Sequence, residues 1–179
     1  MTEEDLIKGC LRNEAASQKE VFDRYASRML GVCYRFARNS ADAEDILQDA
    51  FIKVFSKVKQ FKSEGSFEGW IRRIVVNTAI KKYSLARYSK ELTGYEINEQ
   101  LHPADPSAYG HLSEKDLIAL INRLPDGYRL IFNLNIIEGY QHEEIAEMLS
   151  IQPGTSRSQL VKARHMLQKQ IIALQKVAV

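Results

Sequence analysis

Residues 139–160, GYQHEEIAEMLSIQPGTSRSQL, decide the fold of the C-terminal part of the chain. A short amphipathic run at 141–149 is followed by a tight connection, Ser150–Gln152. Pro153 then suits the first position of a helix, where its missing N–H has no helical partner. Gly154 leaves room for a phosphate at this helix N-terminus, which attracts anions. The order of short helix, tight turn and longer helix predicts a helix-turn-helix.

The longer of these helices is expected to have two faces of different character. Small and apolar residues recur on the inward face at spacings of four, three and four: Ser156, Leu160, Ala163 and Leu167. The outward face is predicted to carry donors and no acid: Arg157, Ser158, Gln159, Lys162, Arg164 and His165. Such side chains bind phosphates, and Arg157 and Gln159 can also read base edges. DNA binding is the favoured interpretation, and the alternative is an antiparallel helix pair with a solvated outer face.

Basic residues gather in two stretches that are far apart in the sequence. Residues 70–90 hold six Lys or Arg and no acid, and residues 157–176 hold five and no acid, although the net charge is only +2. Acidic residues gather instead at 42–49 and 138–147. Two separate basic stretches suggest a polyanion that is contacted twice.

The whole chain has the composition of a soluble globular protein, with 179 residues, 45% hydrophobic and 27% charged. Its apolar runs are short and its first residues lack an apolar signal segment, so we expect a cytoplasmic protein without membrane insertion. Two cysteines, Cys10 and Cys33, form neither a disulfide framework nor a metal cluster, which agrees with a reducing compartment.

Apolar residues recur with helical spacing along most of the chain, and no convincing strand pattern occurs. We therefore predict an all-α protein. Besides the helix-turn-helix, helices are expected at 21–38, 41–59, 67–83, 113–123 and 127–137. Residues 92–112 break this pattern because they contain Pro103, Pro106 and no Lys or Arg. We expect them to be a flexible linker between helical domains at 1–91 and 113–179.

The helix expected near Ser40 carries an acidic stripe formed by Asp42, Asp45 and Asp49, with Gln48 beside them. Acids in the first turn are favoured by the helix dipole. Asp49 lies beyond that turn and repels Asp45, so this stripe costs some stability. The stripe therefore suggests a basic partner surface.

The helix expected at 67–83 carries a basic stripe at spacings of four, formed by Arg73, Asn77 and Lys81. A polar loop, Lys62–Ser66, precedes this helix. Basic residues beside aromatic residues suit single-stranded or melting DNA, and Asn77 with the loop is the candidate pocket for a base. Trp70, with Ile74 and Val75, is expected in the core rather than as a stacking platform.

These motifs resemble a known family. Residues 42–51, DAEDILQDAF, and 67–77, FEGWIRRIVVN, look like region 2 of bacterial sigma factors. Leu124-Pro125, Gly139-Tyr140, Glu144-Ile145-Ala146 and residues 154–158, GTSRS, look like region 4. The resemblance covers residues 20–90 and 113–173, without regions 1.1 and 3, as in the extracytoplasmic-function (ECF) subgroup.

The resemblance implies a promoter-specificity subunit that binds core RNA polymerase through the clamp helices of its largest subunit and through its flap. It implies polymerase contacts by Asp42, Asp45, Ile46, Gln48 and Asp49. At the minus-ten element of promoter DNA it implies melting and base capture by Lys62, Ser66, Trp70, Arg73, Asn77 and Lys81. At the minus-thirty-five element it implies major-groove contacts by Thr155, Ser156, Arg157, Ser158, Gln159, Lys162 and Arg164. It also implies inhibition by an anti-sigma factor, and no cofactor.

The sequence departs from the family pattern at several positions of the helix-turn-helix. Gln141 replaces a Ser that caps better, and Ser156 replaces the more common Val on the inward face, where it should weaken packing. His142 and Gln152 are also uncommon. These departures leave the preferred minus-thirty-five sequence open.

Two other functions are compatible with parts of the sequence. A dimeric helix-turn-helix regulator would explain 113–179 but not the N-terminal stripes. A nuclease would need a metal or nucleophile set, and none stands at a recognisable spacing. The His142-Glu143 pair begins a zinc-protease motif, but Ala146 occupies the place of its second His, so no metal is expected.

Overall fold

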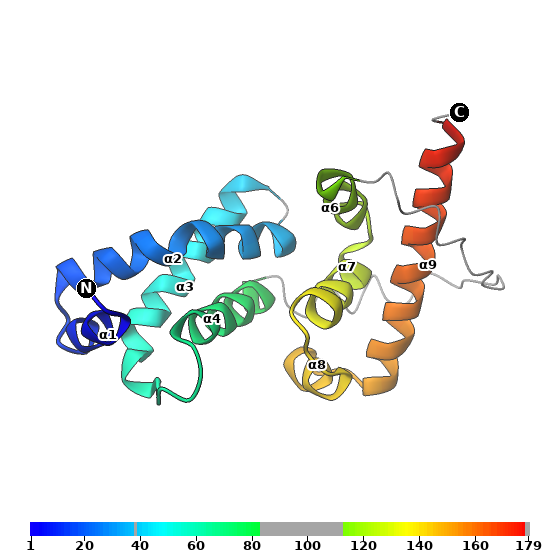
Figure 1. The fold of residues 1–179 in the computed structure, drawn as a ribbon. Coiled ribbons are helices and arrows are strands. Elements are labelled where there is room, and N and C mark those ends of the chain that lie inside the picture. The colour runs from blue at the N-terminus through cyan, green and yellow to red at the C-terminus, as the bar shows by residue number, and fades with distance from the viewer. Residues whose placement is uncertain (38, 83–112, 178–179) are drawn as a thin grey trace. The chain divides into compact units, whose positions relative to one another are not determined.

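The computed structural model describes residues 1–37, 39–82 and 113–177, and all regular secondary structure in these ranges is helical, with no strand among them (Figure 1). The chain forms two compact units, Met1–Tyr83 and Ser84–Val179. The prediction of an all-α protein with two helical domains is confirmed. The expected linker, 92–112, lies outside the described residues.

The N-terminal unit is built from four α-helices and a short 3₁₀ turn. They are α1 (Glu3–Leu11), α2 (Ala15–Phe36), α3 (Ser40–Lys57), η1 (Val58–Gln60) and α4 (Phe67–Lys82). Helix α2 packs against α1, α3 and α4, and α3 also packs against α4 (Figure 1). The apolar spacing in the sequence predicts α2, α3 and α4, whereas α1 was not predicted.

Side-chain caps explain where two of these helices begin. The Asn39 Oδ1 accepts a hydrogen bond of 2.9 Å from the backbone N–H of Asp42 at the start of α3. The Thr2 hydroxyl and the Asp5 carboxylate cap α1 reciprocally, and these hydrogen bonds lower the pKa of Asp5. Each cap satisfies backbone donors that have no partner within the helix.

The core of this unit consists of the inward faces of its helices. The apolar residues that recur at helical spacing along α2 and α3 are buried: Val21, Tyr25, Met29, Val32, Phe36, Leu47, Ala50, Phe51, Val54 and, just beyond α3, Val58. Helix α4 adds Phe67, Ile71 and Val75. Trp70 and Ile74 were expected beside them, but both are only half-buried. Both cysteines are buried and free, and burial raises the pKa of Cys33 to about 12.

The C-terminal unit contains the predicted helix-turn-helix. Its described elements, within residues 113–177, are α6 (Glu114–Asn122), α7 (Asp126–Phe132), a π-helical turn η3 (Asn133–Ile137), α8 (His142–Leu149) and α9 (Pro153–Val177). The helix expected at 127–137 is thus α7 followed by η3. Helix α9 packs against α6, α7 and α8 (Figure 1). Part of its core is formed by Leu124, Tyr128 and Ala163, with Phe132, Met166 and Leu167 packed against them.

The turn between α8 and α9 is closed by the backbone. Ser150 adopts a left-handed conformation with φ of 54° and ends α8. The N–H of Ile151 then donates to the carbonyl of Ala146 over 3.0 Å, as in common helix C-terminal motifs. This turn directs the chain into Pro153, the first residue of α9.

Two isoleucines of the N-terminal unit provide a matched test of this core. Ile71 is fully buried, whereas Ile52 is 68% exposed. Ile71→Ala is expected to lower the free energy of unfolding by about 2–5 kcal/mol, because it removes buried methyl groups and leaves a cavity. Ile52→Ala is expected to change it by less than about 0.5 kcal/mol. Urea unfolding followed by the fluorescence of Trp70, the only tryptophan, reports this unit; equal effects of both variants would contradict the packing described here.

Candidate nucleic-acid interface

Helix α4 presents an exposed basic stripe. Arg73, Asn77 and Lys81 are exposed at spacings of four, as the sequence predicts. The opposite face of the helix is buried through Ile71 and Val75. Burial of one face therefore holds the other in solvent, where it is available to an acidic partner.

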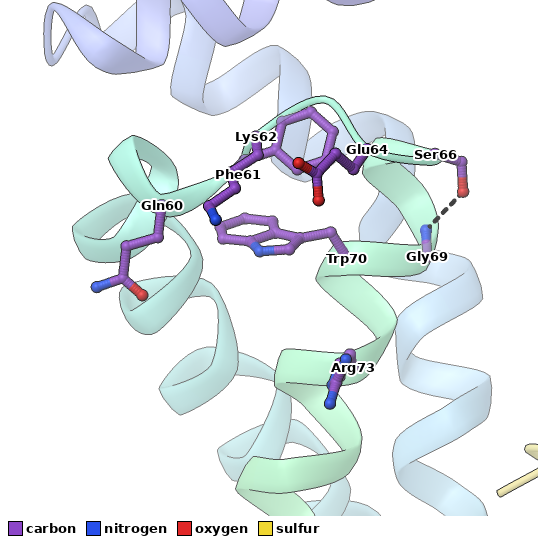
Figure 2. A pocket seen from close by; sticks show the side chains of 8 residues that line it. All are labelled: Gln60, Phe61, Lys62, Glu64, Ser66, Gly69, Trp70 and Arg73. Carbon is purple, nitrogen blue, oxygen red and sulfur yellow. Dashed lines mark hydrogen bonds between the residues drawn. The ribbon is translucent and has the colours of Figure 1, made fainter.

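A pocket lies between the start of α4 and the loop that precedes it (Figure 2). Its volume is about 380 Å³, which is large enough for one nucleobase. It is lined by Gln60, Phe61, Lys62, Glu64, Ser66, Gly69, Trp70 and Arg73. Figure 2 shows the Trp70 indole reaching from α4 toward the loop, with Arg73 on the next turn of the helix. The pocket thus combines an aromatic surface with polar and basic groups.

The burial of Phe67 explains why Trp70 lies at the rim of the pocket rather than in the core. Phe67 is buried, and its ring lies 5.7 Å from that of Trp70 at an interplanar angle of 12°. The Phe61 ring lies 5.1 Å from Phe67 and 5.5 Å from Trp70. Since Phe67 occupies the interior, Trp70 stacks on its outer side and remains half-buried. The expectation that Trp70 belongs to the core is therefore wrong.

The predicted pairing of Asn77 with the loop is also wrong. The pocket ends at Arg73, and Asn77 lies one helical turn beyond it, about 6 Å along the axis. The Ser66 hydroxyl instead accepts a hydrogen bond of 3.0 Å from the Gly69 N–H and fixes the start of α4 against the loop. Residues 66, 69, 70 and 73 share one side of the helix start, and this spacing could have identified the pocket.

The acidic stripe on α3 is exposed at Asp45, Gln48 and Asp49, whereas Asp42 is half-buried. Ile46 is fully buried with the core face of α3, so it cannot contact a partner. The exposed apolar residue on the stripe is Ile52, seven residues after Asp45. Ile52 was not predicted as part of the stripe, although the spacing of two turns places it on the same face.

Lys82 connects the acidic stripe to α4. Its Nζ donates to the Asp45 Oδ2 over 3.0 Å. The Asp45 side chain is largely exposed, and such surface pairs contribute little to stability. The carboxylate of Asp45 therefore remains available to a competing cation.

The outward face of α9 differs from the prediction at two positions. Arg157, Ser158 and Arg164 are exposed, and Thr155 and Lys162 are half-buried. Gln159 and His165, expected outside, are buried, and Ser156 is fully buried as expected for the inward face. Because α9 packs against three helices, it buries a wider arc than the single inward row that the spacing indicated. Ser156 and Gln159 therefore cannot serve as DNA contacts.

Val161 also lies on the exposed face of α9, although it was not predicted to do so. Its side chain is 50% exposed. It lies four residues after Arg157 and three after Ser158, on the same face. An exposed apolar side chain among donors suits the methyl group of thymine in the major groove.

Two side-chain contacts join the start of α8 to the start of α9. The Arg157 Nη1 donates to the Glu143 Oε1 over 3.0 Å. Hydrogen bonds from its own backbone N–H and from Arg157 lower the pKa of Glu143. The His142 Nδ1 and the Ser156 Oγ lie 2.8 Å apart. The buried Ser156 hydroxyl, which was expected to weaken the packing of the inward face, is thus hydrogen-bonded.

Two further kinds of site are not found in the described part of the chain. Within residues 1–37, 39–82 and 113–177, no three His, Cys, Asp or Glu side chains come together as metal ligands. No helix in these ranges is both long and apolar enough to cross a membrane. Neither finding assigns a function.

The sequence matches two families, Sigma-70 region 2 over residues 21–87 and Sigma-70, region 4 over residues 114–167. The ECF RNA polymerase sigma-E factor of Haemophilus influenzae is 27% identical over 183 residues, which cover 96% of each chain. The ECF RNA polymerase sigma factor SigW of Bacillus subtilis is 28% identical and covers 92% of this chain and 94% of its own.

Solved structures support the same fold. The sigma factor RpoE in complex with the anti-sigma factor NepR from Bartonella quintana matches with a TM-score of 0.53 and 23% identity, over 87% of this chain and 96% of RpoE. CnrH in complex with the cytosolic domain of CnrY matches with a TM-score of 0.51 and 17% identity, over 94% of this chain and 96% of CnrH. The matches to both helical units show that the chain belongs to the ECF sigma factors, the subunits of RNA polymerase that recognise promoters.

Proposed function

We propose that the two units divide promoter recognition, with the N-terminal unit capturing a base of the minus-ten element and α9 reading the minus-thirty-five element. The pocket that contains Trp70, next to the basic stripe of α4, carries this proposal. A site for single-stranded DNA needs an aromatic platform and cations that follow the backbone. Trp70 supplies the first, and Lys62, Arg73 and Lys81 supply the second.

The energetic role of the pocket is to offset the cost of melting. Extruding a base costs a few kcal/mol of stacking and pairing. Stacking on an aromatic side chain returns about 1–3 kcal/mol per base. Lys62 and Arg73, at the edge of the pocket, bind the flanking phosphates, and the Ser66 hydroxyl keeps one hydrogen to donate to the base. Asn77 contacts the strand beyond the pocket rather than the captured base.

We assign the minus-thirty-five contacts to the exposed residues of α9. Arg157 has the guanidinium geometry that reads guanine, and Ser158 can contact either a base or a phosphate. Val161 contacts a thymine methyl group. Thr155, Lys162 and Arg164 bind phosphates and position the helix without reading sequence.

We assign core polymerase binding to the stripe formed by Asp45, Gln48, Asp49 and Ile52, with Asp42 at its edge. An exposed isoleucine within a row of polar residues provides the apolar centre that protein interfaces need. The clamp helices of the largest polymerase subunit are the expected partner of this stripe, and the flap is the expected partner of the C-terminal unit. Docking exchanges the Lys82 partner of Asp45 for a cation of polymerase.

We further propose that an anti-sigma factor restrains this protein. RpoE and CnrH, which share its fold, were solved with NepR and with the cytosolic domain of CnrY. The protein acts in the cytoplasm, with polymerase on DNA, and has no catalytic activity of its own. The dimeric regulator considered above would leave the pocket and the acidic stripe without a role, and family membership does not favour it.

Removal of the stacking platform tests the minus-ten pocket. Trp70→Ala is expected to reduce open-complex formation by about 5- to 150-fold, which corresponds to the loss of one base stack. Closed-complex formation by the holoenzyme should stay within twofold. Permanganate footprinting measures the first quantity and gel-shift titration the second. Ile74→Ala, on the same helix but outside the pocket, is the control; an equal loss in both variants or both complexes would refute base capture.

Charge reversal tests polymerase docking. Asp45→Lys combined with Asp49→Lys is expected to abolish binding to core polymerase, because it repels the basic partner surface, while circular dichroism remains that of the wild type. Glu20→Lys combined with Asp23→Lys makes the same charge change on α2 and should leave binding intact. Surface plasmon resonance with immobilised core enzyme compares them. Retained binding by the α3 variant would rule out docking through this stripe.

Two substitutions on α9 separate base reading from phosphate binding. Arg157→Ala is expected to lower the preference for the correct base at one minus-thirty-five position, at a cost of about 1–3 kcal/mol. Lys162→Ala is expected to weaken binding to all sequences alike and to reduce the salt slope by about one. Holoenzyme titrations on single-base promoter variants at several salt concentrations distinguish the two effects. A sequence-independent loss in Arg157→Ala would remove it from base reading.

A further inference from the structure

A polar contact lies inside the junction of the helix-turn-helix, where helices usually meet through apolar groups. Ser156 is fully buried, and its Oγ lies 2.8 Å from the Nδ1 of the half-buried His142. His142 is the first residue of α8, and Ser156 is in the first turn of α9. The contact therefore joins the two helices at the end of α9 that carries the proposed base-reading residues.

The contact between His142 and Ser156 fixes the relative orientation of α8 and α9 as well as the distance between them. A buried hydroxyl without a partner costs free energy, so the arrangement in which His142 satisfies Ser156 is preferred over its neighbours. Hydrogen bonds weaken steeply when misaligned, whereas apolar contacts have no preferred direction. Since the hydroxyl can both donate and accept, either tautomer of His142 makes the bond.

The orientation of Arg157 depends on this contact because Arg157 directly follows Ser156. A rotation of α9 by about 15° would move a side-chain tip that lies about 6 Å from the axis by roughly 1.5 Å. Such a shift is enough to misalign a hydrogen-bonded pair with a base edge. The other contact at this junction, between Arg157 and Glu143, joins two exposed side chains and orients the helix less strongly.

We propose that His142 is a positioning residue for promoter recognition, which acts through Ser156 to set the rotation of α9 and thereby the aim of Arg157. This inference rests on the proposed placement of α9 at the minus-thirty-five element. A histidine and a serine replace apolar packing with one directed hydrogen bond.

The matched pair Ser156→Thr and Ser156→Val isolates the hydroxyl, because the two side chains have nearly the same shape and differ by one hydroxyl for one methyl group. The measured quantity is the ratio of holoenzyme affinities for the preferred promoter and for a variant of the base that Arg157 reads. We expect Ser156→Thr to keep this ratio within twofold of the wild type and Ser156→Val to lower it at least fivefold. Glu147→Gln, an exposed change on α8, should leave the ratio unchanged.

The same comparison can be made from α8. His142→Phe removes the ring nitrogen and should lower the ratio as Ser156→Val does, whereas His142→Asn offers an amide in place of Nδ1 and should restore most of it. In an Arg157→Ala background, His142→Phe should change the ratio less than twofold, since the residue through which it acts is absent. Circular dichroism and core-polymerase affinity verify that each variant is folded, and if Ser156→Val does not fold, the His142 pair gives the result.

Equal ratios for the Thr and Val variants, or for the Phe and Asn variants, would overturn the inference even if all four differ in stability. A loss that persists in the Arg157→Ala background would also overturn it, because His142 would then act elsewhere. Failure of the proposed function looks different. In that case Arg157→Ala itself leaves the ratio of the wild type unchanged, and both proposals fall together.

Discussion

The burial of the Phe67 ring positions most of what the N-terminal unit presents to a partner. Phe67 begins α4, contacts Tyr25 of α2 edge-on at 6.0 Å and packs against Phe61 of the preceding loop at 5.1 Å. Aromatic contacts of this kind add to the burial of apolar area. Together they fix the start of α4 relative to the loop, so that Trp70 stacks outside Phe67 and the pocket opens beside it. The same contacts set the rotation of α4 and expose its basic stripe.

The two units use charge in the same way. Each presents cations for DNA, and each holds one of them against a carboxylate, Lys82 against Asp45 and Arg157 against Glu143. Both carboxylates are largely exposed, and ion pairs at the surface contribute little to stability. A phosphate can therefore replace Glu143 beside Arg157 at small cost, and a cation of polymerase can replace Lys82 beside Asp45. The surfaces proposed for binding are thus separate from the apolar cores that hold the helices together.

Errors in the sequence analysis concern the edges of helix faces rather than their centres. Spacing alone assigned the inward rows of α2 and α3 correctly, because a row of apolar residues is buried whatever it packs against. It did not show how wide each buried arc is. Gln159 and His165 became buried because α9 packs against three helices, and Trp70 stayed at the rim because Phe67 fills the interior. Ile46, expected to contact polymerase, is buried with the core face of α3, and the exposed Ile52 lies on the stripe instead.

Periodicity, capping residues and motif spacing are local properties of the chain, and they were enough to predict the helical class, the order of the two units, the helix-turn-helix and the family. Which side chains form the pocket, and which polar residues are buried, depends on how the helices pack together. Arg73 rather than Asn77 lines the pocket, and His142 pairs with Ser156, which lies fourteen residues later in the chain. These outcomes depend on how two helices, or a helix and a loop, lie against each other, and the spacing within one helix carries no information about that arrangement.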